Sequence, residues 1–106
     1  ADVIYVPTDN TAASNTEAIA NVTVPAKTPV IAGEEGICKG CGVATLSISY
    51  YDLGMTTGKM AAKILTGEAD ISTMPIEFTT ATPKYNASMC EPLGITPLEG
   101  YTAIAE

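Results

Sequence analysis

The alternation of apolar and polar stretches predicts strands and helices in turn along the first half of the chain. Branched and aromatic side chains fill residues 3–7, which predicts a buried strand. Apolar residues then recur at near-helical spacing over residues 12–22, and Ser14 with Glu17 would form a capping box if this helix starts late. Residues 30–32 predict a second short strand.

The second half of the chain is dominated by one longer predicted helix. Residues 44–49 alternate apolar with small polar side chains, which is the period of a strand. Ser49 and Asp52 have the spacing of a capping box, with Asp in place of the usual Glu, and Gly67 is expected to end the helix that follows. One face of this helix carries Leu53, Met60, Ala61, Ile64 and Leu65.

The remaining segments complete an α/β pattern. Residues 75–78 predict a further strand, and the proline-rich tail has room for one short helix that starts near Asn86. The order strand, helix, strand, strand, helix, strand predicts a three-layer α/β fold with a largely parallel sheet. Ligands of such sheets bind outside the carboxyl ends of the strands. This rule selects three loops as candidate binding sites: Thr8–Thr11, Gly33–Gly36 and Ser47–Asp52.

Length and composition limit the possible functions. At 106 residues the chain can bury one modest core, and its 46% of apolar residues excludes a disordered tail. The formal net charge of −7, scattered lysines and the lack of arginine argue against a nucleic-acid partner. Histidine, the commonest general base and metal ligand, is also lacking, so we expect no enzyme, no metal site and no cofactor.

Neither a membrane span nor a signal peptide is evident in the sequence. No apolar run approaches the roughly 18 residues that a bilayer requires, and no basic, apolar leader precedes the first expected strand. Because the chain opens inside that strand, we expect it to be a fragment that lacks an upstream portion.

The first loop carries groups that could hold a small polar solute. The exposed amides and hydroxyls of Thr8, Asp9, Asn10 and Thr11 suit such a ligand. Asp9 could accept a hydrogen bond from an ammonium or hydroxyl group. The alternative is that Asp9 or Asn10 only caps the helix that follows, because these residues are common caps.

The other two loops add acids, hydroxyls and an aromatic ring. Glu34 and Glu35 lie between glycines and predict an exposed, mobile acidic rim, in which one carboxylate could pair with the amino group of a ligand. Two alternatives remain: an acid–base pair, which the divergence of adjacent side chains disfavours, and solvated loop acids. Ser47, Ser49 and Tyr50 lie at a further strand-to-helix turn, where a tyrosine can wall off a ligand or simply pack.

Cys38 and Cys41 form a C-x-x-C motif in a glycine-rich stretch. A disulfide that staples this loop in an oxidising compartment is the leading interpretation, and two reduced thiols are the next. A thioredoxin-like redox pair requires the motif at a helix N-terminus, whereas a strand pattern follows it here. A zinc site requires four ligands, and Cys90 is the one further thiol in a chain without histidine.

Five blocks of the chain resemble one bacterial family. Residues 2–11 and 29–36 contain the first two loops, residues 44–54 contain the third, and residues 57–65 and 84–95 cover the long helix and the tail. In this order the blocks resemble the substrate-binding proteins of ABC transporters, in particular the tryptophan- and tyrosine-type binders. The resemblance covers nearly the whole chain, and the C-x-x-C motif has no role in it.

The resemblance implies the type I periplasmic-binding fold, in which two α/β lobes close on a ligand. Residues 1–49 are then the later part of the second, C-terminal lobe, residues 50–80 return to the first lobe, and residues 81–106 cross back to the second. A lone fragment would expose the apolar face of its long helix, so we expect a homodimer or a domain-swapped assembly.

The resemblance also implies a function and a place of action. The full-length protein would be the extracytoplasmic solute-binding component of an ABC importer, periplasmic or a cell-surface lipoprotein, which captures a small solute such as an amino acid for an ABC permease. Alternatives are a sensory ligand-binding domain of the same fold and a redox protein that uses its C-x-x-C thiols. The positions that the resemblance assigns to the ligand are Thr8 to Thr11, Glu34 or Glu35, and Ser47, Ser49 and Tyr50.

Overall fold

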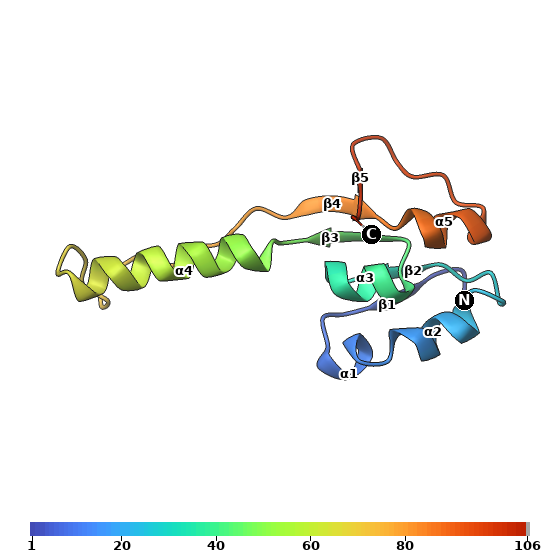
Figure 1. Ribbon diagram of the computed structural model, residues 1–106, viewed down its shortest axis with the longest axis horizontal. Helices are drawn as coiled ribbons and strands as arrows, with labels where there is room; N and C mark the ends of the chain where they lie inside the picture. Colours follow the sequence, from blue (N-terminus) through green and yellow to red (C-terminus); the bar gives the residue numbers. More distant parts are fainter. Residues whose placement is uncertain (106) are drawn as a thin grey trace. The chain divides into compact units, whose positions relative to one another are not determined.

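In the computed structural model, which describes residues 1–105, the chain forms five strands and five helices (Figure 1). They divide into two compact units, of which the smaller is Ile48–Ala81. The assignment of the units to two lobes remains a prediction. The smaller unit contains α4 (Tyr50–Leu65), and the larger contains β1 (Ile4–Val6), α1 (Asn10–Ala13), α2 (Thr16–Thr23), β2 (Val30–Ala32), α3 (Glu35–Cys41), β3 (Ala44–Ser47), β4 (Thr82–Tyr85), α5 (Ala87–Leu93) and β5 (Thr102–Ala103).

The sheet of the larger unit is largely parallel, as the sequence predicts. Its strands follow the order β1-β2-β3-β4-β5, and β1, β2 and β3 run parallel to one another. β4 runs antiparallel to β3, and β5 runs parallel to β4. Helices α1 and α2 connect β1 to β2, and α3 connects β2 to β3, because parallel neighbours need a crossover connection. The predicted α/β fold is confirmed.

The core of the larger unit lies between the sheet and α3. Val6, Ala32 and Thr45 are neighbours in the register of β1, β2 and β3, so their side chains share one face. Helix α3 contacts β2 and β3 and also α1 and α2. The buried apolar cluster consists of Val30, Ala32, Ile37, Cys38, Cys41 and Ile104, and Val6, Ala12, Ile19 and Ala20 pack against it.

The first strand has the predicted position but not the predicted burial. β1 lies at the edge of the sheet, and its residues Ile4 and Tyr5 are 36% and 65% exposed. The prediction of a buried strand is therefore wrong, because a run of branched and aromatic residues also suits an edge strand that is covered on one face.

The single helix predicted over residues 12–22 is divided into α1 and α2. The capping box of Ser14 and Glu17 does not form. Instead, Ser14 Oγ donates to the carbonyl of Asn10 at 2.9 Å, and Asn15 is the N-cap of α2. Ser14 thus belongs to the end of the first helix rather than to the start of the second.

Helix α3 is not predicted from the sequence, in which residues 33–41 read as a glycine-rich loop. Glu34 caps the helix with its side chain. The glycine at position 40 serves the packing of α3 on α2, because a Cβ there would collide with Thr16. The residues that this short helix buries are Ile37, Cys38 and Cys41.

The part of the chain after α4 differs in one strand from the prediction. Within the described residues, no strand pairs with residues 75–78, and they do not form the predicted strand. A strand without a partner would leave its backbone N–H and C=O groups unsatisfied. Residues 82–85 form β4 instead. The helix expected near Asn86 is confirmed as α5, with Asn86 as its N-cap and Pro92 in its last turn.

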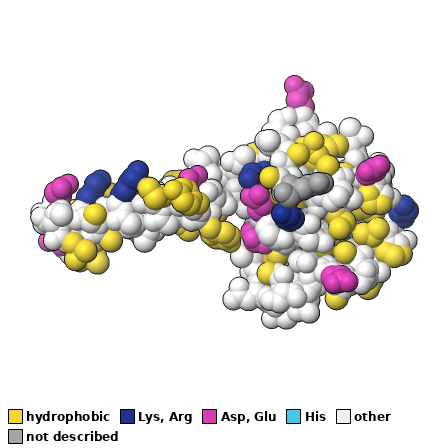
Figure 2. Space-filling view, in the orientation of Figure 1, with side chains coloured by type: hydrophobic (Ala, Val, Ile, Leu, Met, Phe, Trp, Pro, Cys, Tyr) yellow, Lys and Arg dark blue, Asp and Glu magenta, His cyan; other side chains and the backbone are white. Residues whose placement is uncertain are grey.

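The smaller unit is built on α4. Ser49 Oγ accepts from the amide of Asp52 at 3.1 Å, which confirms the predicted cap. No residue of α4 is buried, and hydrophobic side chains lie on its surface (Figure 2). On the predicted apolar face of α4, Leu53, Met60 and Ile64 are partly buried, whereas Leu65 is 86% exposed and does not belong to this face. None of the helices described within residues 1–105 has the length and apolarity to cross a membrane. The groove beside α4 is lined by Met60, Ile64, Ile71, Met74 and Ile76, among others.

Candidate functional site

The loops that follow β1 and β2 meet at one edge of the sheet. The two strands are parallel, so their carboxyl ends lie side by side, as predicted. The amide of Gly33 donates to the carbonyl of Val6 at 2.8 Å. Thr8 approaches Gly33 so closely that a Cβ on this glycine would lie 2.7 Å from the amide nitrogen of Thr8. The glycine thereby permits direct contact between the two loops.

The Thr8–Thr11 loop combines a helix cap with exposed polar groups. Asp9 is the N-cap of α1, and its Oδ1 accepts from the amide of Ala12 at 2.8 Å. Thr8, Asp9, Asn10 and Thr11 are all exposed. The capping alternative therefore holds for Asp9, and the hydroxyls and amides of its neighbours remain accessible from solvent.

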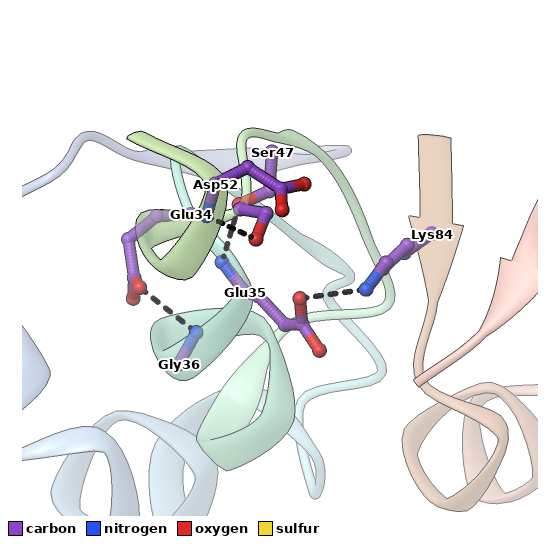
Figure 3. A network of polar contacts seen from close by, with 7 residues as sticks. Glu34, Glu35, Gly36, Ser47, Asp52 and Lys84 are labelled. Atoms are coloured by element: carbon purple, nitrogen blue, oxygen red, sulfur yellow. Dashed lines mark hydrogen bonds and ion pairs between the residues drawn. The ribbon is translucent and has the colours of Figure 1, made fainter. Parts of the chain in front are cut away.

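Glu34 is fixed rather than mobile. It is the N-cap of α3, and its carboxylate accepts from the amides of Gly36, at 2.9 Å, and Ile37 (Figure 3). A negative charge at this position also compensates the positive end of the helix dipole. The expectation of an exposed, mobile rim is thus wrong for this residue, because its carboxylate already serves the backbone of α3.

Glu35 connects three segments of the larger unit. Its amide donates to Ser47 Oγ at 3.1 Å, and its Oε2 forms an ion pair with Lys84 Nζ at 2.8 Å (Figure 3). The side chains of Lys84 and Glu35 are 31% and 37% exposed. Glu35 is therefore also held in place, and the mobile rim is wrong for it as well. Sequence reasoning missed Lys84, because its role depends on the unpredicted pairing of β4 with β3.

The third loop is divided between the two units. Ser47 is buried at the end of β3, where its hydroxyl accepts from the amide of Glu35, so it supports the acidic loop. Ser49 and Tyr50 belong to the smaller unit, in which Ser49 caps α4 and Tyr50 is 56% exposed. Two residues before Ser47, Thr45 is 2% exposed and its hydroxyl has no hydrogen-bond partner among the described residues.

The three cysteines are buried free thiols, so the disulfide expected between Cys38 and Cys41 is not formed. Both residues lie in α3, where Cys41 Sγ donates to the carbonyl of Ile37 at 3.4 Å. Burial, with smaller contributions from the nearby Cys90 and Cys41, raises the pKa of Cys38 to about 12. Such thiols stay protonated near neutral pH, which disfavours the alternative of thiol–disulfide chemistry. Within residues 1–105, no cluster of His, Cys, Asp and Glu side chains could hold a metal ion.

An apolar hollow of about 230 Å³ lies at the other end of the strands. Val3, Pro29 and Val43, which precede β1, β2 and β3, contribute to its wall. None of its lining residues is charged, which makes it a poor site for a charged solute. The polar edge formed by the loops after β1 and β2 and by the end of β3 is therefore the better candidate site for such a solute.

Comparison with known proteins gives consistent matches. A family model described as ABC transporter substrate binding protein matches residues 1–105. Over 68 residues the chain is 38% identical to a tyrosine-binding protein of Clostridioides difficile (strain R20291), a match that covers 64% of this chain and 20% of that protein.

Solved structures match over almost the whole chain. A ligand-free, open substrate-binding protein with adhesive properties from Clostridium difficile has a TM-score of 0.76 at 34% identity. An ABC domain in complex with L-Trp from Streptococcus pneumoniae has a TM-score of 0.80 at 32% identity. A conserved domain protein from Vibrio cholerae has a TM-score of 0.81 at 30% identity. These matches cover 96% to 97% of this chain but only 35% to 37% of the solved chains.

Proposed function

Because this chain belongs to the ABC transporter substrate-binding protein family, we propose that it forms part of an importer's solute-binding protein and contributes one wall of the ligand site. The observation that carries the proposal is the meeting of the loops after β1 and β2 at one sheet edge, through the bond from Gly33 to Val6. The Glu35–Ser47 bond joins the end of β3 to the same edge. Ligands of open α/β sheets bind at this edge.

The solute that we propose is an amino acid with an aromatic side chain. Two relatives support this class, since one is named for tyrosine and the other was solved with L-Trp. In this chain, Thr8, Asn10 and Thr11 offer exposed hydroxyls and amides, and the acids of the edge suit an ammonium group. Ser49 and Tyr50 are proposed as further ligand contacts.

We propose that the complete binding protein has two lobes. The larger unit then belongs to the second lobe, and the smaller unit returns to pack on the first. In support, the chain spans about a third of the length of the solved relatives, and α4 contains no buried residue. Closure of the lobes on the solute, outside the cytoplasmic membrane, would present the loaded protein to the permease.

Without the other lobe, the surface of α4 needs a different partner. Expressed alone, the 106-residue chain should form a homodimer or a domain-swapped dimer, because exposed apolar surface favours association. Light scattering after size-exclusion chromatography measures the mass directly. A monomer at all concentrations tested would contradict this part of the proposal.

The function is tested by a thermal-shift screen of the two-lobe protein against amino acids, nucleosides and sugars. We expect L-tyrosine or L-tryptophan to raise the melting temperature, because a ligand that binds only the folded state stabilises it. The 106-residue chain alone should bind the same amino acid far more weakly, since half of the enclosing surface is missing.

A matched pair of variants locates the site. Asn10→Ala at the polar edge should weaken binding, whereas Asn21→Ala on the exposed surface of α2 should not. Stabilisation by sugars or nucleosides alone would contradict the choice of an amino acid. Equal affinities of the two variants would contradict the assignment of the first loop.

A further inference from the structure

The ion pair between Lys84 and Glu35 has no role in the function proposed so far. It lies at the same end of the sheet as the candidate site, because Glu35 begins the helix that follows β2 and its amide donates to Ser47 Oγ at the end of β3. Among the described lysines of the larger unit, Lys84 is the one at this edge. Of the other lysines in the larger unit, Lys27 donates to the carbonyl of Pro92 and Lys39 lies in the last turn of α3, while Lys59 and Lys63 belong to α4 in the smaller unit.

Both charged side chains project from fixed positions. Glu35 lies in the first turn of α3, where its amide is bound by Ser47 Oγ. Lys84 lies directly opposite Thr45 in the antiparallel pairing of β4 with β3. Side chains that start from rigid elements lose little freedom when they bind a ligand, so the pair is preorganised.

We propose that the Lys84–Glu35 pair binds the two charged groups of a zwitterionic amino acid. Lys84 donates to the α-carboxylate, and Glu35 accepts from the α-ammonium group. The inference rests on the proposed function and names the part of the site that selects zwitterions. An α-amino acid carries its opposite charges on one carbon, and the pair presents opposite charges 2.8 Å apart in the complementary order.

The pair can bind such a ligand without being broken. An ammonium group has three N–H donors, and a carboxylate has two oxygens with about four acceptor sites. The contact between the two side chains uses Glu35 Oε2. About a third of each side chain is exposed, so a solute can approach from the solvent side.

Thr45 provides an independent indication that an oxygen atom belongs beside Lys84. Its side chain lies on the same face of the sheet as that of Lys84, because the two residues are direct partners in an antiparallel pair. The Thr45 hydroxyl is buried and has no hydrogen-bond partner among residues 1–105. Buried hydroxyls are rarely left unsatisfied, and a water or ligand oxygen held by Lys84 would supply the partner.

The charge of the chain makes this cation decisive for ligand choice. With a net charge of −7, the chain repels anions, so a solute carboxylate needs a local cation at the site. Since there is no arginine, Lys84 supplies that cation in this lobe. A pair with both signs favours zwitterions over simple amines and simple acids.

The test is calorimetric titration of the two-lobe protein with L-tryptophan, tryptamine and indolepropionate. Tryptamine lacks the carboxylate, and indolepropionate lacks the ammonium group. Lys84→Met should weaken the binding of L-tryptophan by about tenfold or more, because the variant loses a charge-assisted hydrogen bond to the carboxylate. The affinity for tryptamine should be unchanged. Glu35→Gln should weaken the binding of L-tryptophan and of tryptamine and leave the affinity for indolepropionate unchanged. Lys27→Met, a change of the same charge away from the edge, should alter none of the three.

The outcomes separate this inference from the proposed function. If the wild-type protein binds L-tryptophan and both variants bind it equally well, the inference is overturned while the proposed function stands. If the wild-type protein binds none of the three compounds, both fail. Misfolding is not expected, because a pair exposed to this extent contributes little to stability. If a single variant unfolds, the double variant Glu35→Lys with Lys84→Glu keeps an ion pair with its charges exchanged. It then tests which charged group of the ligand faces which side chain.

Discussion

Replacing Gly33 by alanine tests whether the loops after β1 and β2 depend on their close approach. A Cβ at this position would lie 2.7 Å from the amide nitrogen and 3.0 Å from Oγ1 of Thr8, whereas non-bonded heavy atoms prefer about 3.5–4.0 Å. The closest atom belongs to the backbone and cannot rotate away, so the two loops must separate by roughly 1 Å.

The cost of this separation follows from overpacking and from one hydrogen bond. Overpacking of a tight contact costs about 1–3 kcal/mol. Weakening the 2.8 Å bond from Gly33 to the carbonyl of Val6 adds about 1 kcal/mol. We therefore expect Gly33→Ala to lower the free energy of unfolding by about 2–4 kcal/mol.

Urea unfolding followed by circular dichroism measures the change, and Gly58→Ala is the matched control. Gly58 lies inside α4, and apart from the neighbouring backbone of this helix no atom lies within 4 Å of the added methyl group, so alanine there should stabilise the protein by about 0.5–1 kcal/mol. The same substitution is thus expected to have opposite signs at the two positions. An unchanged urea midpoint for Gly33→Ala would refute the reasoning, because the loops would then have room that the structure does not show.

Two further predictions concern α5 and the buried thiols. Asn86→Ala removes the 2.9 Å hydrogen bonds from its side-chain amide to the carbonyls of Cys38 and Lys39, together with the α5 cap, and should lower the free energy of unfolding by about 3 kcal/mol. The control Asn21→Ala, on the exposed surface of α2, should change it by less than about 0.5 kcal/mol. Equal urea midpoints for the two variants would contradict this prediction. Burial raises the pKa of Cys38 from 9.0 to about 12, so between these values the unfolded chain binds fewer protons than the folded chain and stability falls as pH rises. In a pH series of urea midpoints, Cys38→Ala should show a shallower alkaline loss than wild type, and parallel curves would contradict it.

The sequence predicts the parallel part of the fold because that part follows from local patterns. The strand at residues 30–32, the strand at residues 44–47 and the long helix after Ser49 each have a clear period or cap. A helix is predicted between the strands at residues 3–7 and 30–32, so the parallel pairing of these two strands and the common edge of their carboxyl ends follow from topology. The placement of the Thr8–Thr11 and Gly33–Gly36 loops at one edge could therefore be predicted.

Helix α3 could not be predicted in this way. It has seven residues and contains two glycines, so its intrinsic stability is low and it depends on packing against the sheet and α2. Its N-cap is Glu34, which is not among the usual capping residues. The two acids consequently read as a mobile loop, although one is bound to the helix and the other to a lysine.

Strand β4, which carries Lys84, could not be predicted from the sequence for a different reason. Thr82–Tyr85 includes a proline and shows no alternation of buried and exposed residues. Its pairing with β3 joins segments that are far apart in sequence, and the Glu35–Lys84 contact spans 49 positions. Long-range contacts of this kind have no local signature, so the most specific feature of the candidate site emerges only from the folded chain.

The central claim is that the solute binds where the parallel strands end. It is tested most directly by mapping amide chemical-shift changes in the two-lobe protein on titration with L-tryptophan. The account predicts that, within the larger unit, the largest changes fall on residues 8–11 and 33–36. Changes confined to residues that border the apolar hollow at the opposite end, such as Val3, Val43, Ile95, Thr96, Leu98 and Tyr101, would contradict it.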